Sequence, residues 1–225
     1  MGVRDVAIQR VIKPILRDNQ PKATHRVARQ AFDKAVDGIG PLKPASVDAE
    51  NQLRKAGGNV SRAIDEIISD HVKFAAVEGF ATNLGGLVSM AVLVPTNIAG
   101  LALLHCRMVA EIAHLRGYDL SDPRVRNAVF ACMLGKDAVR DLVRDKKIPA
   151  APYDIATGQP LDQQSADTIA AAVTAELIAR AAGKSTFTFI GKRVPLLGGA
   201  VGSATDAWAT RRIGKYAAKE LRPLS

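Results

Sequence analysis

Apolar residues recur at every third or fourth position over most of the chain, which is the spacing of one face of an α-helix. The clearest stripe predicts a helix that begins after Asn59 or Ser61, either of which can cap its first turn. Its apolar positions are Ile64, Ile67, Ile68, Val72 and Ala75. We therefore expect an all-α protein.

The N-terminal segment combines the same spacing with many basic residues. Val3, Ala7, Val11 and Ile15 lie four positions apart and predict an amphipathic helix, which Pro14 should bend or split. A helix of this kind either docks on a core or lies on a membrane surface.

The best domain boundary lies at 38–45, a stretch that holds two glycines and two prolines. It follows a predicted helix over 23–37. We expect it to separate a basic, amphipathic helical arm (1–45) from a helical main body (46–225).

Glycine and proline also mark helix ends in the main body. A helix entered at Pro95 should end with Gly117 in the left-handed conformation. Asp122 followed by Pro123 is typical of a cap residue and the first position of the next helix. Other helices are expected over 47–56, 167–182, 187–194 and 196–221, with a long polar loop over 146–164.

The most informative segment is 79–104, which has no charged residue over 26 positions. Its length reaches the roughly 20 apolar residues that a membrane-spanning helix needs. Glycines near one end and the sequence Pro95-Thr96-Asn97 divide it into two pieces, each too short to cross a bilayer. A helical hairpin, either buried in the protein or re-entrant in a membrane, fits better than one straight span. The predicted fold is a multi-helix bundle with this glycine-rich apolar hairpin at its centre.

Glycine pairs occur in two apolar segments, where the lack of a side chain lets helices approach closely. The positions expected to do so are Gly85, Gly86, Gly198, Gly199 and Gly202.

The chain of 225 residues carries a net charge of +9 that is unevenly placed. Residues 1–60 hold 11 basic and 6 acidic residues, and residues 184–225 hold 8 and 2, whereas the middle is nearly neutral. Such basic ends suit anionic lipid headgroups or nucleic-acid phosphates, and a merely solvated surface is the plain alternative. The cations expected to face a membrane are Arg4, Arg10, Lys13, Arg17, Arg211, Arg212, Lys215 and Lys219.

Composition excludes several classes of protein. Hydrophobic residues make up 48% of the chain, which is too many for a disordered protein. Two cysteines exclude a disulfide-stapled scaffold and a four-cysteine zinc module. An aromatic content of 4% argues against a platform that stacks nucleic-acid bases. We find no catalytic motif and no convergent metal ligands, so we expect no catalytic residue, metal or cofactor.

Polar residues within the apolar segments are better clues. Arg107 and Glu111 are spaced as neighbours on one helix face, and Asp206 could pair with Arg107 in the core. Together with Asn97 these residues form either a satisfied structural network or the lining of a small pocket.

A combination of short motifs over about 60–220 resembles the EcsC protein family, specifically its short actinobacterial-type members. The first group is Ala75-Ala76-x-Glu78-Gly79-Phe80, Thr82, Leu84-Gly85-Gly86, Pro95-x-Asn97, Arg107-Met108-Val109-Ala110-x-Ile112-Ala113, Leu115-Arg116-Gly117-Tyr118-Asp119 and Asp122-Pro123. The second is Val194-Pro195-Leu196-x-Gly198-Gly199, Val201-Gly202, Asp206-x-Trp208 and Arg211-Arg212. The chain has Asn83 where many relatives have glycine, and Asn97 where many have an acidic residue, so a carboxylate function at the second position is in doubt.

The resemblance implies a helical protein that is cytoplasmic or membrane-associated, with a link to transport and secretion at the membrane and no reaction to carry over. Our first hypothesis is a non-enzymatic protein at the inner face of the cytoplasmic membrane, whose partner is anionic lipid or a membrane protein. The second is a small-ligand-binding protein or enzyme with a buried polar pocket around Asn97, Arg107, Glu111 and Asp206. We do not expect nucleic acid as a partner, because only the charge favours it. A homo-oligomer is compatible with the sequence.

Overall fold

The computed structural model describes residues 32–38, 43–76, 96–181 and 200–224. Throughout these residues the regular secondary structure is α-helical, which confirms the all-α prediction. A short helical segment at 32–37 precedes the labelled helices. These are α4 (Ala45–Lys55), α5 (Val60–Ala76), α7 (Thr96–Leu115), α8 (Pro123–Leu134), α9 (Lys136–Arg144), α10 (Pro152–Thr157), α11 (Gln163–Ala181) and α12 (Ala200–Glu220).

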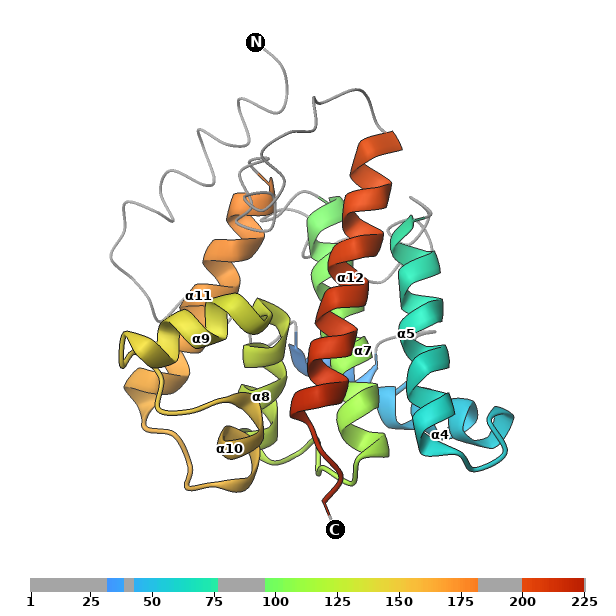
Figure 1. The fold of residues 1–225 in the computed structure, drawn as a ribbon, viewed down its shortest axis with the longest axis horizontal. Helices are drawn as coiled ribbons and strands as arrows, with labels where there is room; N and C mark the ends of the chain where they lie inside the picture. The colour runs from blue at the N-terminus through green and yellow to red at the C-terminus, as the bar shows by residue number, and fades with distance from the viewer. Residues whose placement is uncertain (1–31, 39–42, 77–95, 182–199, 225) are drawn as a thin grey trace.

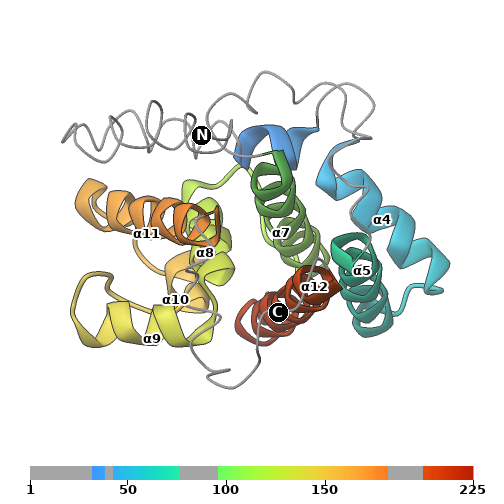
Figure 2. The same ribbon diagram turned by 90° about the horizontal axis from the view of Figure 1, so that it is seen from above.

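Two helices, α7 and α12, form the middle of the molecule. Figures 1 and 2 show α4 and α5 on one side of them, and α8, α9, α10 and α11 on the other. The middle of α7 is fully buried at Met108, Val109, Ala110, Ile112 and Ala113. A helix that is apolar on nearly all sides belongs at the centre of a bundle, where neighbours cover every face.

Helix ends follow the local sequence. The Asn59 side-chain oxygen accepts a hydrogen bond from the backbone N–H of Arg62 at 2.9 Å, which caps the start of α5. The Asp122 carboxylate accepts from the backbone N–H of Arg124 at 2.8 Å, with proline at the first position of α8. Gly117 has a φ of 87°, so α7 ends in the left-handed conformation as expected.

Two features after α8 were not predicted from the sequence. Gly135, with a φ of 79°, ends α8 and turns the chain into the separate helix α9. The predicted loop over 146–164 is wrong in its middle, because it contains α10. Pro152 starts this short helix, and Ile155 is buried against the core, so packing stabilises a helix that its six residues alone would not form.

Gly214 on α12 permits a close contact with two other helices. A methyl group added there would lie 2.8 Å from Ile68 Cγ1 on α5 and 3.1 Å from Met108 Sδ on α7. Three helices therefore meet at a position that only glycine fills without displacement. Of the predicted close-packing glycines, Gly202 lies in the first turn of α12.

Several predictions fall outside the described residues, including most of the apolar segment at 79–104. The same holds for Arg4, Arg10, Lys13, Arg17, Gly85, Gly86, Gly198 and Gly199. In the portion that can be searched, no helix combines the length and the hydropathy needed to cross a bilayer. The segment at 32–38 shares the main core through Phe32, whose ring centroid lies 4.9 Å from that of Phe130 on α8. A division of the chain at residue 45 stays a prediction.

Candidate functional site

The structure brings Arg107 and Glu111 together in the core. The two residues lie one turn apart on α7, with Arg107 Nε 3.1 Å from Glu111 Oε1. Only 5% of Arg107 and 3% of Glu111 is exposed. Two ionisable groups this deeply buried are costly unless they are paired, and they pair here with each other.

Arg107 also joins two earlier parts of the chain to α7. Its Nη1 donates to the backbone carbonyl of Ala35 at 3.1 Å, and its Nη2 donates to Asp48 Oδ2 at 2.5 Å. A guanidinium has five N–H donors in a rigid fork, so one side chain can donate to Ala35 and Asp48 in different directions while it also pairs with Glu111. Arg107 therefore links the helical segment at 32–37, α4 and its own helix.

His71 completes the cluster from α5. Its Nδ1 lies 2.8 Å from the backbone oxygen of Ile67, and because a carbonyl only accepts, Nδ1 carries the proton. In the neutral ring Nε2 therefore has a lone pair. That atom lies 4.0 Å from Glu111 Oε2, which is within electrostatic range but longer than a hydrogen bond.

Burial shifts both titrating groups toward their neutral forms. Desolvation raises the pKa of Glu111 from 4.5 to about 8, and the nearby positive charge of Arg107 offsets only part of this rise. Desolvation also lowers the pKa of His71 from 6.5 to about 4, with Arg107 lowering it further. Asp48, whose side chain is 40% exposed, already balances the charge of Arg107. The cluster is neutral overall when Glu111 and His71 hold one ionisable proton between them.

The remaining predicted members lie elsewhere. Asn97 is in the first turn of α7, and its side chain is outside the described residues. Asp206 is on α12 and is not among the partners of Arg107; its backbone carbonyl accepts from Thr210 Oγ1 at 2.7 Å. The buried contact between α7 and α12 at this level joins Thr210 to His105 Nε2 at 2.8 Å. Since the single Thr210 proton goes to Asp206, the His105 nitrogen is the donor.

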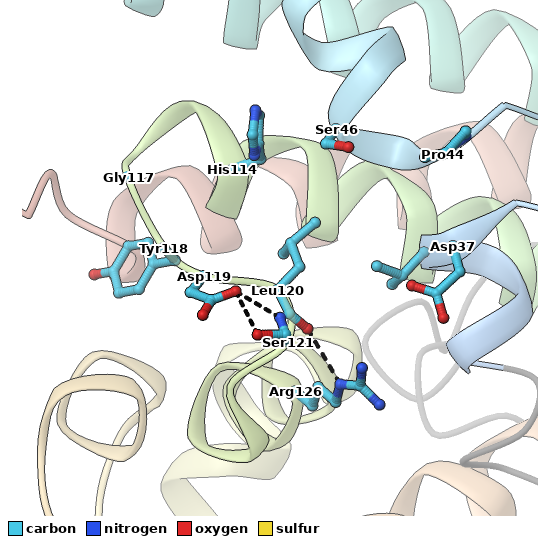
Figure 3. Close-up of a pocket in the computed structure, with 11 residues that line it drawn as sticks. Asp37, Pro44, Ser46, His114, Gly117, Tyr118, Asp119, Leu120, Ser121 and Arg126 are labelled. Carbon is cyan, nitrogen blue, oxygen red and sulfur yellow. Dashed lines mark hydrogen bonds between the residues drawn. The ribbon is translucent and has the colours of Figure 1, made fainter.

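A pocket of about 530 Å³ lies at the other end of α7, where the α7–α8 turn meets the start of α4. Figure 3 shows Asp119 and Ser121 turned toward each other on its wall, with His114 across from them. The Asp119 carboxylate accepts from the backbone N–H and hydroxyl of Ser121 at 2.8 and 2.7 Å, and these bonds hold its pKa below the usual range. Arg107, Glu111 and Asp206, three of the residues expected around a pocket, do not line this one.

Two other charged side chains of the pocket have partners. His114 pairs with Glu50 at 2.9 Å, and Arg126 donates to Asp33 at 2.6 Å. Binding pockets present a few polar groups that converge on a ligand. Because Asp119, His114 and Arg126 are bonded to other residues of the protein, the pocket does not define a ligand class.

The exposed face of α12 carries a basic stripe, defined here as Trp208, Arg211, Lys215 and Lys219. The spacings of three, four and four positions place these side chains on one helix face, and all are exposed. Along the described residues, none of the three cations forms an ion pair with a carboxylate. Arg212, beside the stripe, instead pairs with Asp137 at the start of α9 at 3.0 Å.

Comparison with known proteins identifies the family. The model of the EcsC protein family matches residues 7–223, nearly the whole chain. The chain belongs to the EcsC protein family. No curated protein and no solved structure matches it. The family match extends the sequence resemblance, which covered 60–220, into the basic N-terminal segment.

Two residues of the buried cluster in this EcsC protein were missed by sequence reasoning. Asp48 lies 59 positions from Arg107, and no local pattern connects them. The burial of His71 could have been inferred from the sequence, because His71 continues the apolar stripe of Ile64, Ile67 and Ile68 on α5. Among the side chains that could be examined, no group of three or more His, Cys, Asp or Glu residues is placed to hold a metal ion.

Proposed function

We propose that this EcsC protein is a non-enzymatic helical protein that acts at the inner face of the cytoplasmic membrane, accessory to transport or secretion. The observation that carries the proposal is the basic stripe of α12, where three exposed cations point away from the core without carboxylate partners among the described residues. Anionic lipid headgroups are the complementary surface.

The strength expected of such a contact is moderate. A basic residue close to an anionic membrane contributes on the order of 1 kcal/mol, so the three cations of the stripe contribute about 3 kcal/mol to reversible binding. Arg4, Arg10, Lys13 and Arg17, at the other basic end, would add to it. The interaction should weaken with salt, because exposed charges are screened over about 10 Å at 0.1 M ionic strength.

A binding role fits better than catalysis because the ionisable groups in the core form hydrogen bonds and ion pairs with one another. Arg107 donates hydrogen bonds to Ala35 and Asp48 and forms an ion pair with Glu111, which is only 3% exposed. Reactive side chains of enzymes instead face a cleft that admits substrate.

Vesicle flotation tests the proposal. The purified protein is floated with phosphatidylcholine vesicles or with vesicles that contain phosphatidylglycerol, at low and high salt. We expect flotation with the anionic vesicles alone and release at high salt. The variant R211Q/K215Q/K219Q should float poorly.

A matched control removes the same charge elsewhere. Lys55, Arg62 and Lys73 are exposed on α4 and α5, and the variant K55Q/R62Q/K73Q should float like the unmodified protein. Equal loss in both variants would show that only net charge matters, and no flotation of the unmodified protein would refute the membrane proposal.

A further inference from the structure

Trp208 is exposed in an unusual setting. It is the only tryptophan in the chain, and 43% of its surface is accessible although tryptophan is usually well covered in folded proteins. It lies at the N-terminal end of the basic stripe, three positions before Arg211 and on the same face of α12.

The indole ring has a supported position. The guanidinium carbon of Arg212 lies 4.7 Å from the ring centroid, a cation–π contact. Arg212 is itself held by Asp137 on α9 at 3.0 Å. The ring is therefore braced through α9 while much of its surface stays accessible, so little side-chain freedom remains to be lost when another surface covers it.

Among the described residues, none of the other large exposed apolar side chains begins a comparable row of cations. Val47 lies on α4, Phe74 on α5 and Leu224 after the end of α12. Trp208 alone begins the row of cations at 211, 215 and 219. From Trp208 to Lys219 the stripe extends about 16 Å along the helix, at 1.5 Å per residue.

We infer that Trp208 is the apolar anchor of the membrane contact, inserting its indole at the headgroup level of an anionic bilayer while α12 lies along the surface. The inference rests on the proposed function and adds the depth in the bilayer, the headgroup level, at which the protein makes contact. Tryptophan suits this zone because its body is apolar and its ring N–H can bond to the wet headgroups. Cations on the same face then lie at the depth of the lipid phosphates.

A bilayer fits the stripe better than nucleic acid does. Nucleic-acid phosphates would satisfy the cations equally well, but sequence-independent binding of single strands relies on several aromatic side chains for stacking. The stripe supplies one, at its end. A surface with one apolar anchor beside a row of cations matches a membrane surface, where apolar acyl chains lie beneath charged headgroups.

Tryptophan fluorescence gives a direct test, because the single indole makes the signal unambiguous. The full chain is mixed with vesicles of phosphatidylcholine, with or without phosphatidylglycerol, that carry bromine atoms at shallow or deep positions of the acyl chains. With the anionic vesicles we expect a blue shift of the emission and stronger quenching by shallow than by deep bromines.

Substitutions of Trp208 test how much the indole ring contributes to the free energy of membrane binding. We expect W208A to partition about tenfold more weakly into anionic vesicles, and W208F to recover part of the loss. The control V47A alters a side chain of similar exposure, 41%, on another helix and should bind like the unmodified protein. Circular dichroism verifies that each variant is folded.

The other possible outcomes refute either the anchor alone or the anchor together with the proposed function. Salt-sensitive flotation with unchanged emission, or equal binding of W208A and V47A, would refute the anchor and leave the proposed function standing. Absence of flotation would refute both. An emission change with duplex DNA but none with vesicles would also refute both and assign the stripe to nucleic acid.

Discussion

The imidazole Nε2 of His71 lies 4.0 Å from Oε2 of Glu111, across the contact between α5 and α7. The other ring nitrogen of His71, Nδ1, donates to the backbone oxygen of Ile67. The other carboxylate oxygen of Glu111, Oε1, forms the ion pair with Arg107. With the charge of Arg107 balanced by Asp48, the His71–Glu111 pair is electrically neutral when it holds one ionisable proton. This proton makes the core sensitive to pH.

The pH dependence of stability follows from the two opposite pKa shifts. The raised pKa of Glu111, about 8, contributes stability that is present below pH 4.5 and is lost as the pH rises to about 8. The lowered pKa of His71, about 4, makes stability increase between about pH 4 and 6.5. The two effects oppose each other up to pH 6.5, so this pair should lower stability mainly between pH 6.5 and 8, by about 2 kcal/mol.

Urea unfolding from pH 4 to 9 measures this effect. In E111Q the decline above pH 6.5 attributable to the pair should disappear, and the increase between pH 4 and 6.5 from His71 should emerge. Parallel stability curves for E111Q and the unmodified protein would contradict the assignment of the proton to this pair.

Loss of Arg107 should destabilise the fold strongly. R107M would leave Asp48 and the Ala35 carbonyl without their donor and Glu111 without its ion-pair partner, at a cost of about 3–5 kcal/mol. R107K should recover only part of this, because an ammonium group cannot serve three separated partners. Midpoints of urea unfolding give the comparison. R144M, which removes an exposed paired arginine on α9, should change the midpoint little; a similar loss in both variants would refute the role of Arg107.

Gly214→Ala should destabilise the protein by about 1–3 kcal/mol, because the added methyl would overlap Ile68 Cγ1 at 2.8 Å. A double-mutant cycle isolates the cause. I68A removes the opposing atoms, so G214A should cost less in that background than alone. Equal costs in both backgrounds would assign the effect to something other than this contact.

Both cysteines should be inert in the native state. Cys106 and Cys132 are buried, and burial raises the pKa of each thiol, so little thiolate exists for reaction. A chromogenic disulfide reagent should react with two thiols in concentrated guanidinium chloride and with neither in buffer, apart from slow reaction through unfolding. Fast labelling of the folded protein would contradict their placement.

Local features of the fold were predictable from sequence because they depend on neighbouring residues. Asn59, Gly117 and the pair Asp122-Pro123 mark helix ends through their own side chains or backbone freedom. α10 was missed because its stability comes from Ile155 packing on distant residues, which no local pattern reveals.

The candidate site was predictable only within α7. The spacing of Arg107 and Glu111 indicated that they share a helix face, and the structure brings them together. The choice of Asp48 rather than Asp206 as a further partner depends on which helices lie beside α7, and helical periodicity does not encode that arrangement. Gly214 was missed for the same reason, since its importance comes from the side chains that two other helices place against it.

The buried hydrogen bond between His105 and Thr210 joins positions 105 residues apart, and this separation bears on how the chain matures. During synthesis α5 and α7 leave the ribosome well before α12, so the apolar surface around Ile68 stays uncovered until α12 is synthesised. Contacts between residues far apart in the sequence slow folding, so this apolar surface stays exposed to solvent for longer. A nascent chain interrupted before α12 should therefore be a client for chaperones.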